Sequence, residues 1–217
     1  MKTLDQLIKE LKKEGISEKV LKAIALIKRE YFVLKEYKNL AYENEALPFI
    51  KGQTTSQPLV IANIIDELQL DSNDVVLEIG TGSGWQTLLL AFFSFKVITF
   101  EVDKDILSLG INNIKNFIQS YPDFELLYKK IEFHNLNIFK AKEFIEKLDK
   151  VDKVVFSAAV SKIPEFLFNK LSYNGIIIAP IITNNEYQKL MKYIKLDNKE
   201  IKESFISFVS FVLAKEN

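Results

Sequence analysis

The sequence contains no cysteine and only one histidine, His134. Without cysteine the chain cannot form a disulfide, use a thiolate nucleophile or hold a metal through thiolates. A single histidine also excludes a multi-histidine metal site, so we expect no metal. Neither sign of charge is in excess, because 29 lysines and arginines balance 29 aspartates and glutamates. The chain as a whole therefore has no net electrostatic attraction for nucleic acid or for an anionic membrane.

Long apolar runs are absent as well. The longest uncharged stretch, residues 79–95, opens with a Gly/Ser/Thr loop and falls short of the roughly 20 apolar residues of a membrane helix. Residues 1–14 mix charged with apolar side chains and contain no hydrophobic signal core. We therefore expect a cytoplasmic protein without a membrane or nucleic-acid partner, and we favour a monomer.

The composition is typical of a globular protein, with 48% hydrophobic and 27% charged residues among 217. Apolar residues at helical spacing predict a short amphipathic helix over 4–11 and a second helix that begins after an N-cap at Ser17. Residues 31–57 lose this periodicity, and irregular segments of that length tend to carry function. Pro58 suits the first turn of a third helix, whose apolar stripe runs to Leu68.

After residue 74, strand-like apolar runs alternate with helical patterns. Strands are expected at residues 75–79, 96–100, 131–133, 152–158, 175–181, 186–196 and 204–214, with helical segments at 87–93, 105–118, 138–148 and 163–171. Such alternation is typical of right-handed βαβ units on a parallel sheet, whereas the last strands have short connections and a turn at Asp197–Asn198. The sequence predicts an α/β fold with a doubly wound, mostly parallel sheet, N-terminal helices and a C-terminal antiparallel strand pair.

A glycine-rich loop follows the first predicted strand of this sheet. Three of the seven glycines fall within five residues, in the segment Glu78-Ile79-Gly80-Thr81-Gly82-Ser83-Gly84. A loop between a strand and a helix lies at the carboxyl edge of the sheet, where ligands bind in such folds. Glycine allows a close approach of backbone to a ligand, and the following helix N-terminus suits an anionic group.

The spacing of this loop distinguishes between ligands. A dinucleotide fingerprint has the form G-x-G-x-x-G/A, and here Trp85 occupies the third glycine position. Glu78 favours a ligand that carries positive charge, and Glu101, at the end of the next strand, suits a ribose diol. The pattern indicates S-adenosylmethionine rather than NAD. The alternative is that the glycines form only a tight turn from strand to helix.

The segment before the loop adds a more specific pattern. GQTTSQP (52–58) precedes EIGTGSGWQ (78–86), and residues 29–58 show R-x-x-F-V, AY-[ED], LP and GQT-x-SQP in order. This combination resembles the protein-L-isoaspartate O-methyltransferase family, which repairs isoaspartyl damage using S-adenosylmethionine. SAAV (157–160) and Gln188 also fall on family positions. The resemblance implies a Rossmann-like fold of the class I methyltransferase type and acceptors that are isoaspartyl-containing peptides or proteins.

The resemblance also implies roles for residues. Ser56 falls on the active-site serine, next to the transferred methyl group. The expected cofactor-binding residues are Glu78, Gly80, Thr81, Gly82, Ser83, Gly84, Glu101 and Asn135, and the expected substrate-binding residues are Gln53, Thr54 and Thr55. Residues 1–57 are expected to form the N-terminal helices and substrate-side loop, and residues 58–217 the S-adenosylmethionine-binding domain, together as one compact unit.

Several positions depart from the family pattern, and they concern the acceptor side rather than the cofactor side. They are Lys28, Leu34 and Val160 in place of proline, Ile50 and Ile182 in place of glycine, and Ser207 and Ser210 in place of arginine and proline. Alternatives are therefore a class I methyltransferase with a changed acceptor or a cofactor-binding protein that has lost catalysis. An NAD-linked oxidoreductase is disfavoured by Trp85. Outside the family context, Ser56 and Thr55 are best interpreted as caps of the helix at Pro58.

Overall fold

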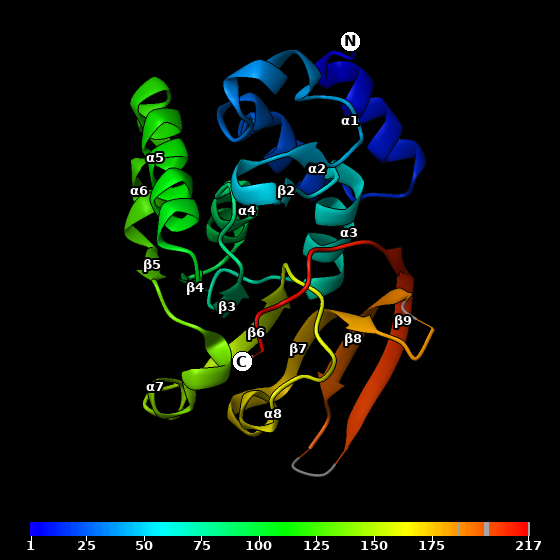
Figure 1. The fold of residues 1–217 in the computed structure, drawn as a ribbon, viewed down its shortest axis with the longest axis vertical. Coiled ribbons are helices and arrows are strands. Elements are labelled where there is room, and N and C mark those ends of the chain that lie inside the picture. Colours follow the sequence, from blue (N-terminus) through cyan, green and yellow to red (C-terminus); the bar gives the residue numbers. More distant parts are fainter. Residues whose placement is uncertain (186, 198–199, 217) are drawn as a thin grey trace.

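The computed structural model describes residues 1–185, 187–197 and 200–216, which form a seven-stranded sheet with helices on both faces (Figure 1). The strands lie in the order β5-β4-β3-β6-β7-β8-β9. Their bounds are β3 (Val75–Ile79), β4 (Lys96–Phe100), β5 (Ile131–His134), β6 (Val151–Phe156), β7 (Leu171–Ile182), β8 (Gln188–Lys195) and β9 (Ile201–Val209). Neighbouring strands pair in parallel from β5 through β4, β3 and β6 to β7. β8 and β9 then add antiparallel pairs at one edge. The predicted mostly parallel sheet with antiparallel C-terminal strands is confirmed.

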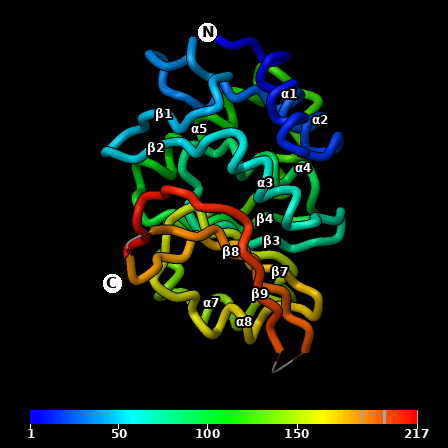
Figure 2. Tube along the Cα trace, turned by 90° about the vertical axis from the view of Figure 1, so that its right-hand side faces the viewer, coloured from blue at the N-terminus to red at the C-terminus, as the bar shows by residue number. Residues whose placement is uncertain are grey.

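The helices form two layers around this sheet (Figures 1 and 2). Their bounds are α1 (Leu4–Lys13), α2 (Glu18–Leu26), α3 (Pro58–Leu68), α4 (Trp85–Phe93), α5 (Lys104–Ser120), α6 (Glu125–Lys129), α7 (Lys142–Glu146) and α8 (Glu165–Lys170). Alternate strand residues point to opposite faces, so Val76 and Val97 pack with α1 to α6, whereas Leu77 and Ile98 pack with α7 and α8. Both faces are covered, which explains the nearly continuous apolar strands.

The front segment, predicted to be irregular, consists of short pieces. They are the 3₁₀ turns η1 (Arg29–Tyr31), η2 (Lys35–Leu40) and η3 (Ile50–Gly52), and the two-residue strands β1 (Leu47–Pro48) and β2 (Thr54–Thr55), which pair with each other. A further 3₁₀ turn, η4 (Pro122–Phe124), precedes α6. Ser17 is the N-cap of α2 as predicted, but its hydroxyl bonds to Asp66 of α3 rather than to α2. The first helices are thereby tied to the helix that follows the front segment.

Two expected elements need correction, and two further expectations fall partly outside the described residues. The strand expected at 204–214 is β9, which ends at Val209 because the chain leaves the sheet at Ser210 and pairs through Leu213 with Ala159. The helix expected at 138–148 is the 3₁₀ turn η5 (Ile138–Lys140) followed by the short α7. The strand expected over 186–196 begins at a position outside the described residues, and so does Asn198 of the predicted turn.

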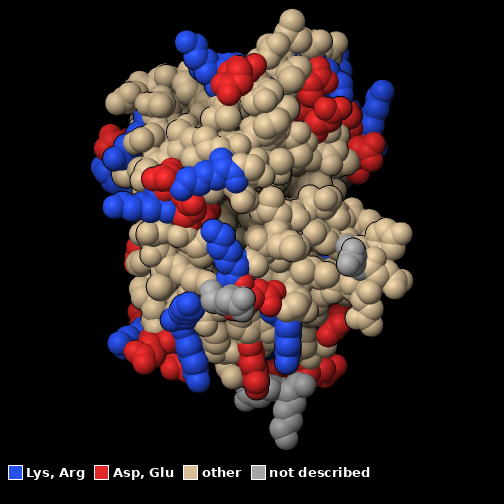
Figure 3. Space-filling view, viewed as in Figure 1, with Lys and Arg blue, Asp and Glu red and all other residues tan. Residues whose placement is uncertain are grey.

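The surface shows no large area of one charge on the face in Figure 3, where acidic and basic side chains are interspersed. Among the helices of residues 1–185, 187–197 and 200–216, none has the length and apolar character that spanning a bilayer requires.

Candidate functional site

A cavity of about 290 Å³ opens at the carboxyl ends of β3, β4 and β6. One wall is the glycine loop, residues 80–83, with Glu101 beyond β4, and the opposite wall is the front segment from Phe49 to Ser56. Residues 136–139 and the C-terminal residues 212–215 also line the cavity. The cavity therefore lies where the sheet topology predicts a ligand site.

The glycine loop packs closely against α5 beside this cavity. Gly84 precedes α4 with φ 86, and a Cβ there would lie 2.8 Å from the carbonyl oxygen of Gly110 in α5. Glu101, only 9% exposed, accepts hydrogen bonds from the backbone N–H groups of Gly82 at 3.2 Å and Asp103 at 3.1 Å. The loop, the end of β4 and the start of α5 thus form one hydrogen-bonded wall.

Glu78 lies behind this wall and is 0% exposed. Its carboxylate accepts hydrogen bonds from Gln86 Nε2 at 3.0 Å, Thr87 Oγ1 at 2.5 Å and Thr99 Oγ1 at 2.8 Å. Burial raises the pKa of Glu78 to about 7, although these three donors pull the pKa in the opposite direction. Glu78 does not line the cavity, so a direct contact with a ligand stays a prediction, and its visible effect is to hold α4 and β4 against β3.

Most predicted site residues meet at the cavity. Those that line it are Gln53, Thr54, Thr55, Ser56, Gly80, Thr81, Gly82, Ser83 and Glu101. Gly84 and Asn135, like Glu78, do not line it. Asn135 is exposed, and its Nδ2 donates to the carbonyls of Glu101 and Val102 at the end of β4.

Sequence reasoning missed Asn137, which lines the cavity two residues beyond Asn135 and bonds to the carbonyl of Lys215 at 2.8 Å. Both asparagines follow β5, and their local sequence does not indicate which amide faces the cavity. Gln86 and Ser157 were also missed, although they line the cavity. Both belong to segments of the family pattern, Ser157 to SAAV (157–160) and Gln86 to EIGTGSGWQ (78–86), but nothing in those segments marks either side chain as part of the site.

A second cavity adjoins the first, between the start of α3, the front segment and residues 208–212. The residues that line both cavities are Thr54, Ser56, Ser157 and Val212. The N-cap of α3 is Gln57, with no side-chain capping bond, so the interpretation of Ser56 or Thr55 as the cap is wrong. Within the described part of the chain the Ser56 hydroxyl makes no hydrogen bond to protein, which leaves it available at the junction of the cavities.

Arg29 holds the segment that carries Ser56. It is 1% exposed and forms no ion pair with a described residue. Its guanidinium donates at 3.0–3.2 Å to the carbonyls of Ala41, Glu43, Glu45 and Ser56 and to the hydroxyl of Thr55. Burial lowers the pKa of Arg29 to about 10, so it remains charged at neutral pH. One buried cation therefore fixes the whole path from residue 41 to residue 56.

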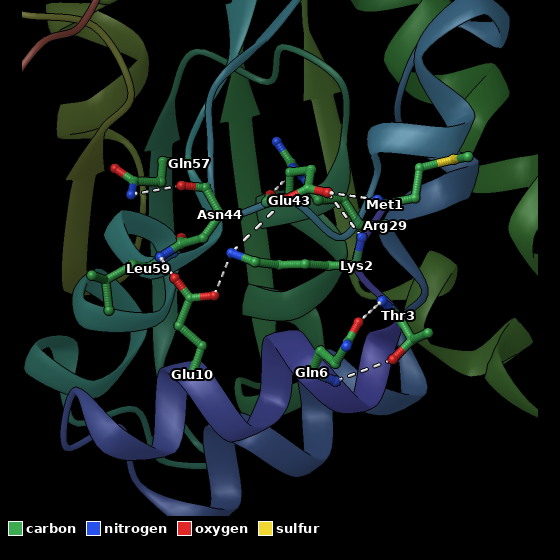
Figure 4. Close-up of polar contacts among 10 residues, drawn as sticks. All are labelled: Met1, Lys2, Thr3, Gln6, Glu10, Arg29, Glu43, Asn44, Gln57 and Leu59. Atoms are coloured by element: carbon green, nitrogen blue, oxygen red, sulfur yellow. Dashed lines mark hydrogen bonds and ion pairs between the residues drawn. The ribbon is translucent and has the colours of Figure 1, made fainter.

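Asn44 and the N-terminus attach this segment from the other side (Figure 4). Asn44 Nδ2 donates to Glu10 of α1 at 3.0 Å, and Asn44 Oδ1 accepts from the backbone N–H of Leu59 in α3 at 3.0 Å. Lys2 Nζ pairs with Glu10 at 2.7 Å, and the Lys2 backbone N–H donates to Glu43 at 2.8 Å. Helix α1 thus packs on the site-bearing segment instead of projecting from the body.

After β9 the C-terminal segment turns back across one end of the sheet toward β6 (Figures 1 and 2). Gln188 Nε2 donates to the carbonyl of Phe211 at 2.9 Å, and Gln188 Oε1 accepts from the Phe211 N–H at 2.6 Å. Ala159 bonds to the carbonyl of Val212 and to the N–H of Ala214, both at 2.8 Å. These contacts place Val212 where it lines both cavities.

Comparison with known proteins gives this geometry a family. The family model described as Protein-L-isoaspartate(D-aspartate) O-methyltransferase (PCMT) matches residues 2–217. The chain is 39% identical over 206 residues to a protein-L-isoaspartate O-methyltransferase of Petrotoga mobilis, covering 94% of this chain and 90% of that protein. A protein of the same name from Yersinia pestis is 31% identical, with 97% and 95% covered.

Solved structures give the same fold. A putative protein-L-isoaspartate O-methyltransferase from Plasmodium falciparum, crystallised with S-adenosyl-L-homocysteine, superimposes with a TM-score of 0.85 at 23% identity over 100% of both chains. The match to the family model and the identity to its named members show that the chain belongs to the protein-L-isoaspartate(D-aspartate) O-methyltransferase family, a family of S-adenosylmethionine-dependent methyltransferases.

Proposed function

We propose that the chain transfers the methyl group of S-adenosylmethionine to the carboxylate of L-isoaspartyl residues in damaged proteins. One observation carries the assignment of the site. The hydroxyl of Ser56, unengaged by any described residue, lies between a cavity lined by the glycine loop and Glu101 and a second cavity that opens beside the front segment. The first is the cofactor side and the second the acceptor side.

The residues of the first cavity fit this cofactor. Glu101 offers a carboxylate to a ribose diol, as in other folds of this topology. Gly82, with φ 52, has open space where a Cβ would stand, so a ligand can approach the backbone of the loop there. Ile106, Leu136 and Phe139 supply an apolar wall for a flat base.

The chemistry needs alignment rather than a strong base. S-adenosylmethionine, when bound, would supply a methyl carbon on a sulfonium. Transfer joins the acceptor oxygen to that carbon and breaks the carbon–sulfur bond, whose electron pair stays on sulfur. No proton moves. The free group of an isoaspartyl residue is its α-carboxyl, which has a pKa of about 3.5 and is already ionised at pH 7. Ser56 donates a hydrogen bond that holds this carboxylate in line with the methyl group. The front segment excludes water from the junction.

The experiment measures transfer of a tritiated methyl group to an isoaspartyl peptide and to its normal aspartyl twin. Label on the isoaspartyl peptide alone is expected. Ser56→Ala should lower kcat at least about tenfold, since alignment by the hydroxyl is lost, with unchanged calorimetric affinity for S-adenosylhomocysteine. Ser120→Ala, an exposed serine at the end of α5, is the matched control.

The other outcomes of this experiment distinguish between the alternatives. Equal turnover of wild type and Ser56→Ala removes the role of Ser56. Label on neither peptide, with S-adenosylhomocysteine bound, identifies a cofactor-binding protein. Label on a different carboxylate only identifies a changed acceptor, which the departures at Ser207 and Ser210 would explain.

We also propose a cytoplasmic monomer that acts on proteins and not on nucleic acid, with residues 1–57 and 58–217 as one compact unit. Interspersed surface charge supports the acceptor class (Figure 3). Contacts across residue 57 support the single unit, including Trp85 Nε1 to the carbonyl of Ile27 at 2.8 Å. Light scattering should give the mass of a single chain, and unfolding should show one cooperative transition. RNA should receive no label.

A further inference from the structure

Ser157, like Ser56, lies where the two cavities meet. It follows β6, lines both cavities, and has a half-buried side chain. Its backbone is fixed to the neighbouring strand, because its N–H donates to the carbonyl of Ile79 at 2.8 Å. A hydroxyl on a fixed backbone at this point faces the same space as the acceptor carboxylate of the proposed reaction.

Gln86, in the first turn of α4, determines which way this hydroxyl can donate. Its Nε2 lies 2.7 Å from Ser157 Oγ and 3.0 Å from Glu78 Oε1, and its side chain is 6% exposed. An amide nitrogen only donates, so Ser157 Oγ is the acceptor in this contact and retains its own hydrogen. In the described ranges no second protein group bonds to Ser157 Oγ.

Glu78 in turn fixes the orientation of the Gln86 amide. When Glu78 is ionised, a reversed amide would place its oxygen against Oε1 of the carboxylate, where two acceptors would face each other. The remaining carboxylate oxygen, Oε2, is occupied by Thr87 and Thr99. The buried acid therefore orients Gln86, and Gln86 leaves the Ser157 hydrogen directed away from itself.

We propose that Ser157 is a second acceptor-binding residue, whose hydroxyl donates to the isoaspartyl carboxylate opposite Ser56, with Gln86 as its positioning residue. The inference rests on the proposed function. A carboxylate has two oxygens, and one donor allows it to rotate, whereas two donors fix its plane. The pair of serines thus selects an acceptor that presents a free carboxylate at the junction.

Ser157→Ala tests this role through the KM for the isoaspartyl peptide. The expected rise is about tenfold, as for loss of one hydrogen bond to a charged group. Calorimetric affinity for S-adenosylhomocysteine should stay at the wild-type value, because the change is on the acceptor side. Ser157→Thr keeps the hydroxyl and should restore most of the KM, and Ser120→Ala should leave it unchanged. Melting temperatures measured in parallel detect any loss of folding.

A double-mutant cycle tests the positioning by Gln86. Gln86→Met removes the donor but leaves the Ser157 hydroxyl, so its KM should rise less than that of Ser157→Ala. The double variant should match Ser157→Ala, since an orienting residue has no effect once the hydroxyl is absent. Effects on log KM that simply add would overturn the positioning role. A wild-type KM for Ser157→Ala in an active enzyme overturns the role of Ser157 alone, whereas an inactive wild-type enzyme refutes the proposed function as well.

Discussion

The two sides of the site are built in different ways. The main wall of the cofactor side follows the ends of adjacent strands, with the glycine loop after β3 and Glu101 after β4, and the sheet itself sets the geometry of that wall. The acceptor side consists of the front segment, the start of α3 and residues 208–212, and side chains such as Arg29 and Gln188 hold these pieces in place. Single substitutions should therefore disturb the acceptor side more readily than the cofactor side.

The largest expected effect comes from Arg29→Met. The change leaves four carbonyls and the buried Thr55 hydroxyl without the bonds that Arg29 donates. We expect the free energy of unfolding in urea to fall by about 4 kcal/mol, within the range for removing one member of a buried charged network. Methyl transfer should be lost, while S-adenosylhomocysteine still binds to the folded fraction, because no atom of Arg29 lines the cofactor cavity.

Arg29→Lys is the control that keeps the charge. An ammonium has three donors and no planar fork, so it can replace only part of the Arg29 network. Its stability should lie between those of wild type and Arg29→Met. A lysine variant with wild-type stability and turnover would show that charge alone, and not the fork of hydrogen bonds, organises the acceptor side.

This contrast also explains what the sequence could predict. The strand, loop and helix around Gly80–Gly84 are local patterns, and the prediction of β3, α4 and the glycine loop is confirmed. The front segment was only predicted to be irregular, because its short elements depend on bonds from Arg29 to residues 12–27 positions away. Family resemblance, rather than periodicity, brought Ser56 into the site.

The sequence predictions that were wrong or incomplete also concern positions that contacts between distant residues determine. Residues 211–214 continue the apolar run of β9, but they leave the sheet and pair with Ala159, and no local signal marks that exit. Asn135 and Asn137 have the same side chain two residues apart, and only the packed structure places Asn137 at the cavity. Burial of Glu78 behind the loop is likewise a result of packing with α4 and β4.

An intermediate effect, on the pH dependence of stability, is expected at Glu78 behind the cofactor side. Its pKa is raised from 4.5 to about 7 by burial, so the folded chain holds this proton more tightly than the unfolded chain. Stability from this group is fully present below pH 4.5 and is lost as the pH rises through about 7. The loss amounts to about 3 kcal/mol, from 1.36 kcal/mol per pKa unit.

Glu78→Gln removes this proton uptake while keeping the side-chain shape. Urea unfolding at pH 5, 6, 7 and 8 should show wild type losing stability relative to the variant as the pH rises. Other titrating groups, such as Asp74, are present in both proteins and cancel in the difference. Parallel stability curves for the two proteins would mean that Glu78 keeps an ordinary pKa in the fold.

The smallest effect is expected at Lys51, which joins the two sides. Lys51 lies in η3 of the front segment, and its Nζ pairs with Asp103 at 2.8 Å and Asp105 at 2.6 Å at the start of α5. These pairs lower the pKa of Asp103 and raise that of Lys51. All three groups are accessible to solvent, so the free energy of unfolding should hardly change in Lys51→Met.

The effect of Lys51→Met should instead appear in the release of S-adenosylhomocysteine, since Lys51 and Asp103 both line the cofactor cavity. Stopped-flow dissociation should be about two- to threefold faster than in wild type, and salt should accelerate wild type but not the variant, because salt screens an exposed ion pair. Lys104→Met is the matched control, since Lys104 is exposed on the same turn and forms no ion pair with a described residue. If both variants dissociate at the wild-type rate with the same salt dependence, the front segment opens independently of this contact, and the two sides of the site are joined only through the Ser56 junction.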